Sequence, residues 1–300
     1  MTLPKISVVT LSYNQGQFLE QTIKSVLEQD YPDLEYIIMD GGSTDNSVEI
    51  IKRYEQHLTY WQSQPDGGQS AAINAGFQRA TGEILCWLNS DDQFTPGTLK
   101  TIGRYFYEHP DCEWVAGSIE FRWLSSGKTS IRQAHLNNNW SILNFWVYGH
   151  AAGAFCPQPS TFWRKELWHR AGGYVREDKP NSMDYELWLR FCKLAECKII
   201  SQVFSIAVLH EQCKSIGNND IQRLETIQTA YAFAKKNGIP LQRRLIFAYE
   251  RQQLAEMVYC VRNFAPRGLL FRLFNILFAP VLLWSIKGKE KRWINFRGKI

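Results

Sequence analysis

Four polar residues, Asn89, Ser90, Asp91 and Asp92, follow directly on the apolar run Ile84 to Leu88. Such a run is typical of a buried strand, so it would deliver two adjacent carboxylates to the strand's carboxyl end, where open α/β sheets bind ligands. Neighbouring buried acids repel each other unless hydrogen bonds or a cation compensate, and beside phosphates that cation is usually a divalent metal. The alternative is that these residues only cap the next helix or form a turn.

The segments around this motif alternate between strand-like and helix-like patterns. Apolar, β-branched runs predict strands at 6–11, 34–40 and 59–64, in addition to 84–88. Helical spacing of apolar residues predicts helices at 18–27, 46–54 and 70–79. Short loops rich in Gly, Asp and Asn join them, which indicates an α/β domain with a Rossmann-like, mostly parallel sheet flanked by helices. The loops that follow the strands should meet at one edge of this sheet.

Four motifs stand in order behind these strands: Tyr13-Asn14, Asp40 to Asp45, Pro65 to Gln69 with Asn74, and Asn89 to Asp92. In this order and spacing they resemble the family 2 glycosyltransferases, which have the GT-A fold. The resemblance continues through Gln158 to Arg164, Gly172 to Tyr174 and Asp184 to Arg190, and it covers roughly residues 5–215. It implies transfer of a sugar from a nucleotide-sugar, most commonly a UDP-sugar, to an acceptor hydroxyl with inversion at the anomeric carbon.

The resemblance also implies which residues bind the nucleotide-sugar donor. They are Ser12, Tyr13, Asn14, Asp40, Asp66, Gln69, Asn74 and Asp91. Asp40 and Asp66 would accept hydrogen bonds from the base or the ribose, and Asp91 would contact the ribose or the sugar. The alternative for Asp40 and Asp66 is a turn closed by Asx hydrogen bonds, and the alternative for Asn74 is capping or packing.

Asp92 is the expected metal-binding carboxylate. His210 is expected as a further ligand, because family members often carry a histidine after the last core strand, here predicted at 203–209. Asn89 stands where many relatives have an acid. Mg²⁺ or Mn²⁺ would suit oxygen ligands and would neutralise charge on the leaving diphosphate. An ordinary edge histidine is an equally open interpretation of His210.

The resemblance assigns Asp184 as the catalytic base, which would take the proton from the acceptor hydroxyl. Asp184 heads a predicted helix, where an anion is favoured, so its alternative role is that of an N-cap. Met183 replaces the Glu that usually precedes this Asp in the family. Glu186 is a fallback base, and Arg190 would either contact the diphosphate or pair with a carboxylate.

The region 121–157 corresponds to the part of the family that helps to bind the acceptor. Trp140 and Trp146 are candidates for this role, because aromatic faces stack well on sugar rings. Burial in the core is the more frequent fate of a tryptophan.

Length and composition agree with a catalytic domain at 1–217 followed by a helical extension at 218–300. The chain has 300 residues, and 45% of them are hydrophobic, as in an ordinary globular protein. Its 7 cysteines include no CxxC pair, which indicates a reducing compartment and no zinc site. No signal-peptide pattern opens the chain, so we expect a cytoplasmic protein.

Positive charge is concentrated near the carboxyl terminus. The net charge is +5, but residues 264–300 alone carry +7, which leaves −2 for the remainder. The apolar stretch at 264–287 contains Arg272, and together with the basic tail it predicts an amphipathic helix on the cytoplasmic face of the inner membrane. The alternative is a helix packed on the catalytic domain with a solvated tail. No nucleic-acid motif accompanies the basic residues, so we expect no nucleic-acid partner.

Taken together, these features predict an inverting, metal-dependent glycosyltransferase of cell-surface polysaccharide or glycolipid biosynthesis. The acceptor would be a saccharide or a lipid-linked saccharide. One alternative is a nucleotidyltransferase, which the lack of a Gly-rich, Arg/Lys-bearing loop after the first strand disfavours. The other is a non-catalytic nucleotide-sugar-binding or scaffolding protein of the same fold, and the presence of Asp92 and Asp184 argues against it.

Overall fold

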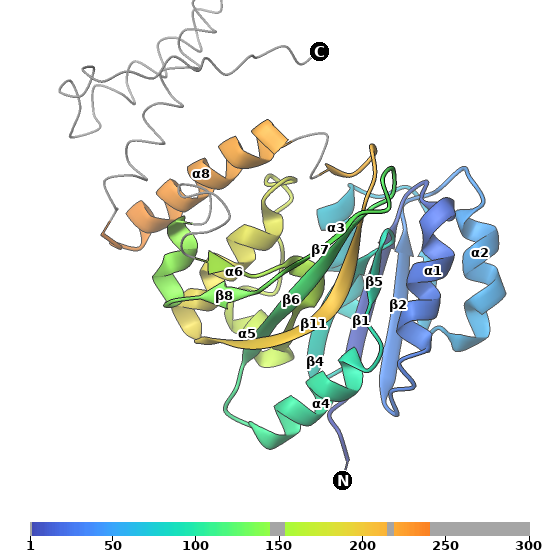
Figure 1. Ribbon diagram of the computed structural model, residues 1–300, viewed down its shortest axis with the longest axis horizontal. Helices are drawn as coiled ribbons and strands as arrows, with labels where there is room; N and C mark the ends of the chain where they lie inside the picture. Colours follow the sequence, from blue (N-terminus) through green and yellow to red (C-terminus); the bar gives the residue numbers. More distant parts are fainter. Residues whose placement is uncertain (1, 145–153, 215–218, 241–300) are drawn as a thin grey trace, which may run out of the picture. The chain divides into compact units, whose positions relative to one another are not determined.

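The computed structural model describes residues 2–144, 154–214 and 219–240 (Figure 1). The chain divides into two compact units, Met1–Leu245 and Ile246–Ile300. The predicted amphipathic helix at 264–287, the basic tail and Trp146 lie outside the described residues. The predicted domain boundary at 217/218 falls inside the first unit. In the described ranges, none of the helices is long and apolar enough to cross a membrane.

Four parallel strands form the amino-terminal half of the sheet, as the sequence predicts. They are β1 (Ile6–Ser12), β2 (Leu34–Asp40), β3 (Tyr60–Ser63) and β4 (Ile84–Asn89). Every residue of β1 is buried, because this strand lies between β2 and β4 and pairs with both. In this register Ser12 lies opposite Asp40, and Leu11 lies opposite Asn89. The carboxyl ends of the strands therefore lie side by side.

Helices cross over between these strands, as parallel pairing requires. They are α1 (Gly16–Leu27), α2 (Ser47–Tyr54) and α3 (Gln69–Arg79), with the short 3₁₀ turn η1 (Glu55–His57) before β3. α1 and α2 pack together on one side of the sheet, and α3 packs on β1 and β2 (Figure 1). Gly76 allows this close approach, since a Cβ there would lie 2.4 Å from Val9 Cγ1.

The carboxyl-terminal half of the sheet is mixed. It contains β5 (Asp92–Phe94), β6 (Trp114–Trp123), β7 (Thr129–Arg132), β10 (Thr161–Arg164) and β11 (Cys197–Leu209). The strand order is β3-β2-β1-β4-β10-β6-β11-β5, and β7 pairs with β6. β10 runs antiparallel to β4 and β6, and β5 runs antiparallel to β11. The predicted α/β class with a mostly parallel sheet is confirmed, while the last predicted strand begins earlier, at Cys197.

The remaining elements cover this second half. They are α4 (Thr98–Glu108), β8 (His135–Leu136), η2 (Asn139–Asn144), β9 (Ala154–Phe155), η4 (Gln158–Ser160), α5 (Lys165–Arg170), α6 (Met183–Leu194) and α8 (Asn219–Lys236). α6 packs on α5, η2 and α8. Trp188 of α6 stacks on Trp87 of β4 and on Trp114 of β6, with ring centroids 5.9 and 5.7 Å apart. These buried aromatic contacts fix α6 against the sheet.

A buried carboxylate stabilises the other end of β1. Glu35 is 3% exposed and accepts hydrogen bonds from Ser7 Oγ, from the Thr81 amide and from Thr81 Oγ1. Lys5 Nζ lies 3.3 Å from Glu35 Oε1. Burial alone would raise the pKa of Glu35, but the hydrogen bonds and Lys5 outweigh it, so the pKa is lowered.

Candidate active site

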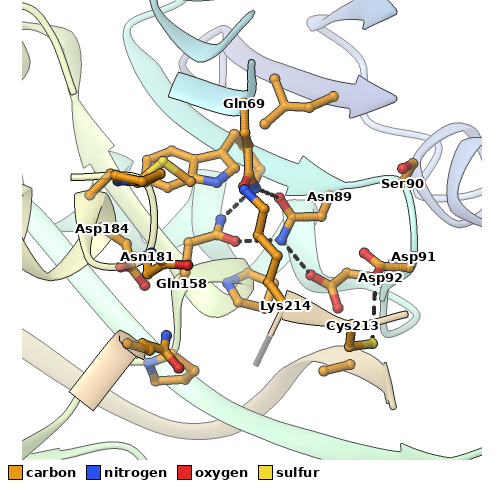
Figure 2. A pocket seen from close by; sticks show the side chains of 18 of the residues that line it. Gln69, Asn89, Ser90, Asp91, Asp92, Gln158, Asn181, Asp184, Cys213 and Lys214 are labelled. Carbon is orange, nitrogen blue, oxygen red and sulfur yellow. Dashed lines mark hydrogen bonds between the residues drawn. The ribbon is translucent and has the colours of Figure 1, made fainter. Parts of the chain in front are cut away.

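A cavity of about 880 Å³ opens at the carboxyl ends of the parallel strands (Figure 2). Its walls come from the loops after β1, β3, β4 and β11, from the start of α6 and from one face of α8. The predicted convergence of the strand-end loops at one edge is therefore present. Ligands bind at this edge in open α/β sheets.

The loops after β1 and β2 are tied to each other. Asn14 has a φ of +51° and accepts a hydrogen bond from the Thr44 amide. Asp40 accepts hydrogen bonds from the Ser43 amide and from Ser63 Oγ, at 2.9 and 2.6 Å. Neither Asp40 nor Asn14 lies in the cavity wall. In this structure both side chains hold turns, as the Asx alternative for Asp40 predicts.

Ser12 and Tyr13 do line the cavity. The Tyr13 side chain is 63% exposed, so its ring is available to a ligand. The buried Ser12 hydroxyl has no hydrogen-bond partner within the described part of the chain. An unpartnered buried hydroxyl is costly, and a bound polar ligand would satisfy it.

The loop after β3 and the first residue of α3 contribute two of the three side chains predicted in this region. Asp66 lines the cavity and closes its own turn by accepting a hydrogen bond from the Gly68 amide. Gln69 lies in the wall, donates to Asn89 Oδ1 and accepts from Lys214 Nζ (Figure 2). Asn74 lies outside the cavity wall and bonds the backbone of Val175 through both its amide atoms. Asn74 thus holds a loop near α6, in line with its packing alternative.

The two acids after β4 have different surroundings. Asp92 begins β5, while α4 has Gly97 as its N-cap, so neither acid caps a helix. Asp92 is 7% exposed, and its carboxylate accepts a hydrogen bond from Asn89 Nδ2 at 3.1 Å. Burial, and then the negative charge of Asp91, raise the pKa of Asp92 well above its usual range. A cation next to this carboxylate would offset both effects.

His210 meets Asp91 rather than Asp92. Its Nε2 lies 3.1 Å from Asp91 Oδ2, and its ring stacks on Phe18 with centroids 4.3 Å apart. Cys213 Sγ lies 3.8 Å from the same Asp91 oxygen, and the three potential ligand atoms lie within 4.8 Å of one another. The structure therefore differs from the expected pairing of Asp92 with His210, although both carboxylates lie at the same end of the cavity.

The donor atoms at this end fit a hard divalent cation. Carboxylate oxygens and an imidazole nitrogen are suitable ligands for Mn²⁺, and carboxylates suit Mg²⁺. Burial raises the pKa of the Cys213 thiol to about 12. A thiolate is a soft ligand that suits Mg²⁺ and Mn²⁺ poorly, so the fit rests on Asp91 and His210, which lie 3.1 Å apart, and on the neighbouring buried carboxylate of Asp92.

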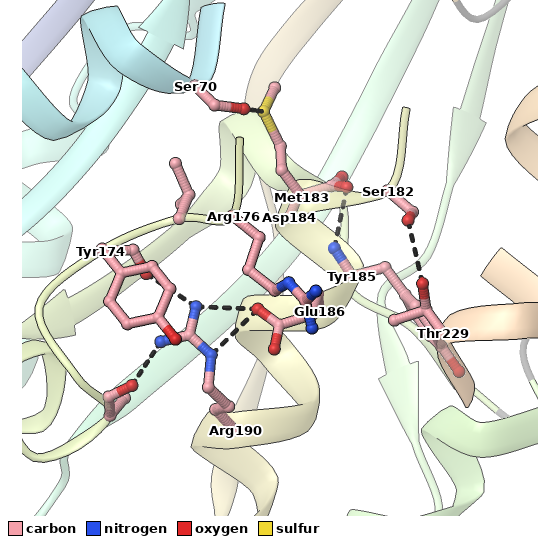
Figure 3. Close-up of polar contacts among 12 residues, drawn as sticks. Ser70, Tyr174, Arg176, Ser182, Met183, Asp184, Tyr185, Glu186, Arg190 and Thr229 are labelled. Carbon is pink, nitrogen blue, oxygen red and sulfur yellow. Dashed lines mark hydrogen bonds and ion pairs between the residues drawn. The ribbon is translucent and has the colours of Figure 1, made fainter. Parts of the chain in front are cut away.

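Asp184 faces the cavity from the first turn of α6 (Figures 2 and 3). The N-cap of this helix is Ser182, so the capping alternative for Asp184 does not hold. Its Oδ1 accepts a hydrogen bond from the Tyr185 amide at 2.8 Å. Burial raises the pKa of the Asp184 carboxyl, and the charge of Glu225 adds to the effect. A raised pKa suits a carboxylate that must accept a proton.

The fallback base and the arginine of the same helix are engaged with each other (Figure 3). Glu186 Oε2 accepts from Arg190 Nε at 2.9 Å, and both side chains are largely buried. Arg190 also donates to the carbonyls of Ala171 and Tyr174. Neither Glu186 nor Arg190 lies in the cavity wall. The fallback role of Glu186 and a diphosphate contact by Arg190 therefore do not agree with this structure.

Several cavity residues carry no role in the sequence-based predictions. They include Gln15, Ser90, Gln158, Asn181, Lys214, Gln222 and Thr226. Gln158 donates to the Trp87 carbonyl and accepts from Asn89, and so it fixes the Asn89 amide (Figure 2). Lys214 brings a cation four residues after His210, a spacing that could have suggested it. For the acceptor candidates, Trp140 lies in η2, where only its backbone is described.

Comparison with known proteins identifies the class. The sequence model of Glycosyl transferase family 2 matches residues 7–159, just over half of the chain, and the chain belongs to this family. A putative teichuronic acid biosynthesis glycosyltransferase of Bacillus subtilis, TuaG, is 36% identical over 102 residues, which are 32% of this chain and 40% of that protein. Curated relatives that are 40 to 43% identical are matched over about a third of their own length.

Solved structures confirm the GT-A fold. Residues 1–349 of TarS from S. aureus, in complex with UDP-GlcNAc, superpose with a TM-score of 0.56 at 18% identity, covering 88% of this chain and 89% of that chain. The mannosyltransferase PcManGT from Pyrobaculum calidifontis, in complex with GDP-Man and Mn²⁺, gives a TM-score of 0.55 at 15% identity, covering 94% and 89%.

Proposed function

We propose that this protein is an inverting glycosyltransferase that moves a sugar from a nucleotide-sugar, preferably a UDP-sugar, to the hydroxyl of a saccharide acceptor. One observation supports the proposal most strongly: Asp184, Asp91 and Asp92 line a single cavity, and His210 lies against Asp91 with its Nε2 3.1 Å from Asp91 Oδ2. This arrangement suits a reaction in which a base deprotonates the acceptor while a cation offsets the negative charge of the donor's diphosphate.

In the proposed reaction the acceptor oxygen attacks the anomeric carbon. The new carbon–oxygen bond forms as the bond from that carbon to the diphosphate breaks, and Asp184 takes the hydroxyl proton. Attack from the side opposite to the leaving group inverts the anomeric configuration. Lys214 offers positive charge in the same cavity, where the diphosphate develops negative charge.

We propose that Asp91, Asp92 and His210 hold a divalent cation, Mg²⁺ or Mn²⁺. Such an ion, when bound, supplies electrostatic stabilisation of the leaving diphosphate. The Mn²⁺ in the PcManGT complex supports this proposal by analogy of fold. The predicted donor contacts of Ser12, Tyr13, Asp66 and Gln69 remain part of the proposal, since all four line the cavity.

The acceptor is proposed to be a growing cell-surface polysaccharide or a lipid-linked saccharide. The cavity has an apolar wall formed by Phe121, Ile142, Phe155 and Leu209, which could contact an acceptor's apolar face. The name of TuaG, with its role in teichuronic acid biosynthesis, supports this class. A cytoplasmic location with peripheral membrane contact through residues 264–300 remains a proposal, and vesicle flotation of the full chain with anionic lipid tests it.

Replacement of Asp184 by Asn tests the proposed function. Turnover of the donor should fall by about 10²–10⁴-fold, because the amide cannot accept the proton. Binding of UDP with Mn²⁺ should persist, as measured by calorimetry. The matched control is Asp178→Asn, which removes an exposed carboxylate outside the cavity wall and should leave turnover unchanged. If Asp184→Asn turns over the donor as fast as the wild type, the assignment of the base is refuted. If the wild type itself binds UDP but shows no turnover, the protein is a non-catalytic binding protein.

A further inference from the structure

Glu225 on α8 reaches across to the start of α6. Its Oε1 accepts hydrogen bonds from the Asn181 amide and from Ser182 Oγ, at 3.1 and 2.8 Å. Its Oε2 accepts from Asn181 Nδ2 at 3.2 Å. One turn further along α8, Thr229 Oγ1 lies 3.4 Å from the same Ser182 hydroxyl (Figure 3). The side chain of Glu225 therefore binds both residues that precede α6.

Ser182, the N-cap of α6, directs its side chain away from its own helix. Ser182 makes no side-chain hydrogen bond to its own helix, although capping serines commonly do so. Its hydroxyl donates to Glu225 instead. Asp184 is the second residue after this cap, so its direction depends on how Asn181 and Ser182 are held. α8 thus contacts, through Glu225, the two residues that lead into the turn bearing Asp184.

The other charged groups around this end are engaged elsewhere. Glu186 pairs with Arg190 on α6 itself. In the preceding loop Arg176 pairs with Asp178, and Glu177 lies 3.3 Å from Asn74 Nδ2.

On the side of α8, Lys214 Nζ donates to Gln69 Oε1 and its charge also interacts with that of Glu225, while Arg223 is exposed. Glu225 is then the carboxylate whose charge acts on Asp184, and it raises the pKa of Asp184 in addition to burial. Met183 provides no charge beside the base, and Ser70 Oγ contacts its sulfur.

We propose that Glu225 is a positioning residue for Asp184, and that α8 is part of the catalytic site rather than of an appended extension. The inference rests on the proposed function of Asp184 as the base. Two further residues of α8, Gln222 and Thr226, line the same cavity, so this helix forms part of its wall.

Glu225→Gln separates positioning from simple structural support. The variant keeps the size of the side chain and removes its charge. We expect kcat to fall on the order of tenfold, because small displacements of a reacting group are costly, while KM for the donor stays within about twofold. The acidic limb of the kcat–pH profile should move to lower pH, because loss of the neighbouring negative charge lowers the pKa of Asp184. Glu225→Asp keeps the charge and should leave this limb near its wild-type position.

The control is Arg223→Gln, which changes the charge of α8 by one at an exposed position and should match the wild type in kcat and pH profile. A Glu225→Gln variant with wild-type kcat, or with reduced kcat and an unmoved acidic limb, would overturn the proposal. A second measurement does not depend on turnover. Titration of the Asp184 carboxyl by ¹³C NMR, assigned with Asp184→Asn, should show a lower pKa in Glu225→Gln than in the wild type. If the wild type transfers no sugar, the proposed function fails, but this titration still decides whether Glu225 acts on Asp184. Equal pKa values of Asp184 in the wild type and in Glu225→Gln would refute the proposed action of Glu225.

Discussion

Asp92→Asn is expected to stabilise the metal-free protein at neutral pH. The Asp92 side chain is nearly fully buried, and Asn89 is its hydrogen-bond partner within the described residues. Its pKa is raised by burial and by Asp91. An acid with a raised folded-state pKa contributes stability below its unfolded-state pKa and loses that contribution as pH rises through the folded-state value. At neutral pH the ionised carboxylate therefore costs free energy of unfolding.

The size of the effect follows from the local contacts. Asparagine has nearly the same shape as aspartate, and its Oδ1 can accept the same hydrogen bond from Asn89 Nδ2. The substitution thus removes an incompletely compensated buried charge without opening a cavity. We expect a gain of about 1–3 kcal/mol in the free energy of unfolding. For a unit of this size, each kcal/mol raises Tm by about 2–4 °C.

The assay is thermal unfolding at pH 7, with a chelator and with Mn²⁺. Manganese at a hundred times its Kd should stabilise the wild type by about 2.7 kcal/mol, and it should stabilise Asp92→Asn much less. Asp178→Asn is the surface control and should follow the wild type in both conditions. A lower Tm for Asp92→Asn in chelator would refute the argument about the buried charge. Equal stabilisation of wild type and Asp92→Asn by Mn²⁺ would show that Asp91 and His210 hold the ion without Asp92.

Three further outcomes are expected from other parts of the molecule. Glu35→Gln should lower the free energy of unfolding by about 1–3 kcal/mol at pH 7. The pKa of Glu35 is lowered in the folded state, so the wild type should lose its extra stability as pH falls from the unfolded-state pKa through the folded-state value. A difference in urea midpoint between wild type and Glu35→Gln that stays constant across acid pH would contradict this. Lys214→Met should lower kcat/KM for the donor by about tenfold, since it removes a positive charge on the diphosphate side, and an unchanged kcat/KM in steady-state kinetics would exclude that contact. Gly76→Ala should lower the free energy of unfolding by about 1–3 kcal/mol although alanine has the better helix propensity, because the new Cβ would lie 2.4 Å from Val9 Cγ1. Adding Val9→Ala to this variant should recover most of the loss in Tm.

The parallel half of the fold is predictable from the sequence. The run at 34–40 matches β2 residue for residue, and 84–88 misses only the last residue of β4. These strands are mostly apolar runs bounded by Gly and Asp turns, so local pattern suffices. The insertion of β10 between β4 and β6 could not be predicted in this way. β10 has four residues, and its place depends on pairing with segments far away in the sequence.

In the candidate site, too, some features follow from the sequence and others do not. The sequence places Asp66, Gln69, Asp91, Asp92 and Asp184 at one cavity, with His210 in contact with Asp91, because motif order and strand ends determine which loops meet. It does not determine which acid faces His210. Successive side chains of an extended segment point to opposite sides, so a one-residue choice between Asp91 and Asp92 needs the register of β5 on β11. Glu225 has no motif around it, and only the packing of α8 on α6 reveals its contact with Ser182.

The anomeric configuration of the product is the sharpest test of an inverting transfer in which Asp184 acts as the base. The full chain, Mn²⁺, an α-linked UDP-sugar and a saccharide acceptor would be followed by ¹H NMR, with Asp184→Asn as the matched control. An inverting displacement with Asp184 as the base predicts a β-linked product from the first turnover and almost none from Asp184→Asn. An α-linked product would contradict displacement by an acceptor hydroxyl that Asp184 deprotonates, and so would a β-linked product formed equally fast by the variant.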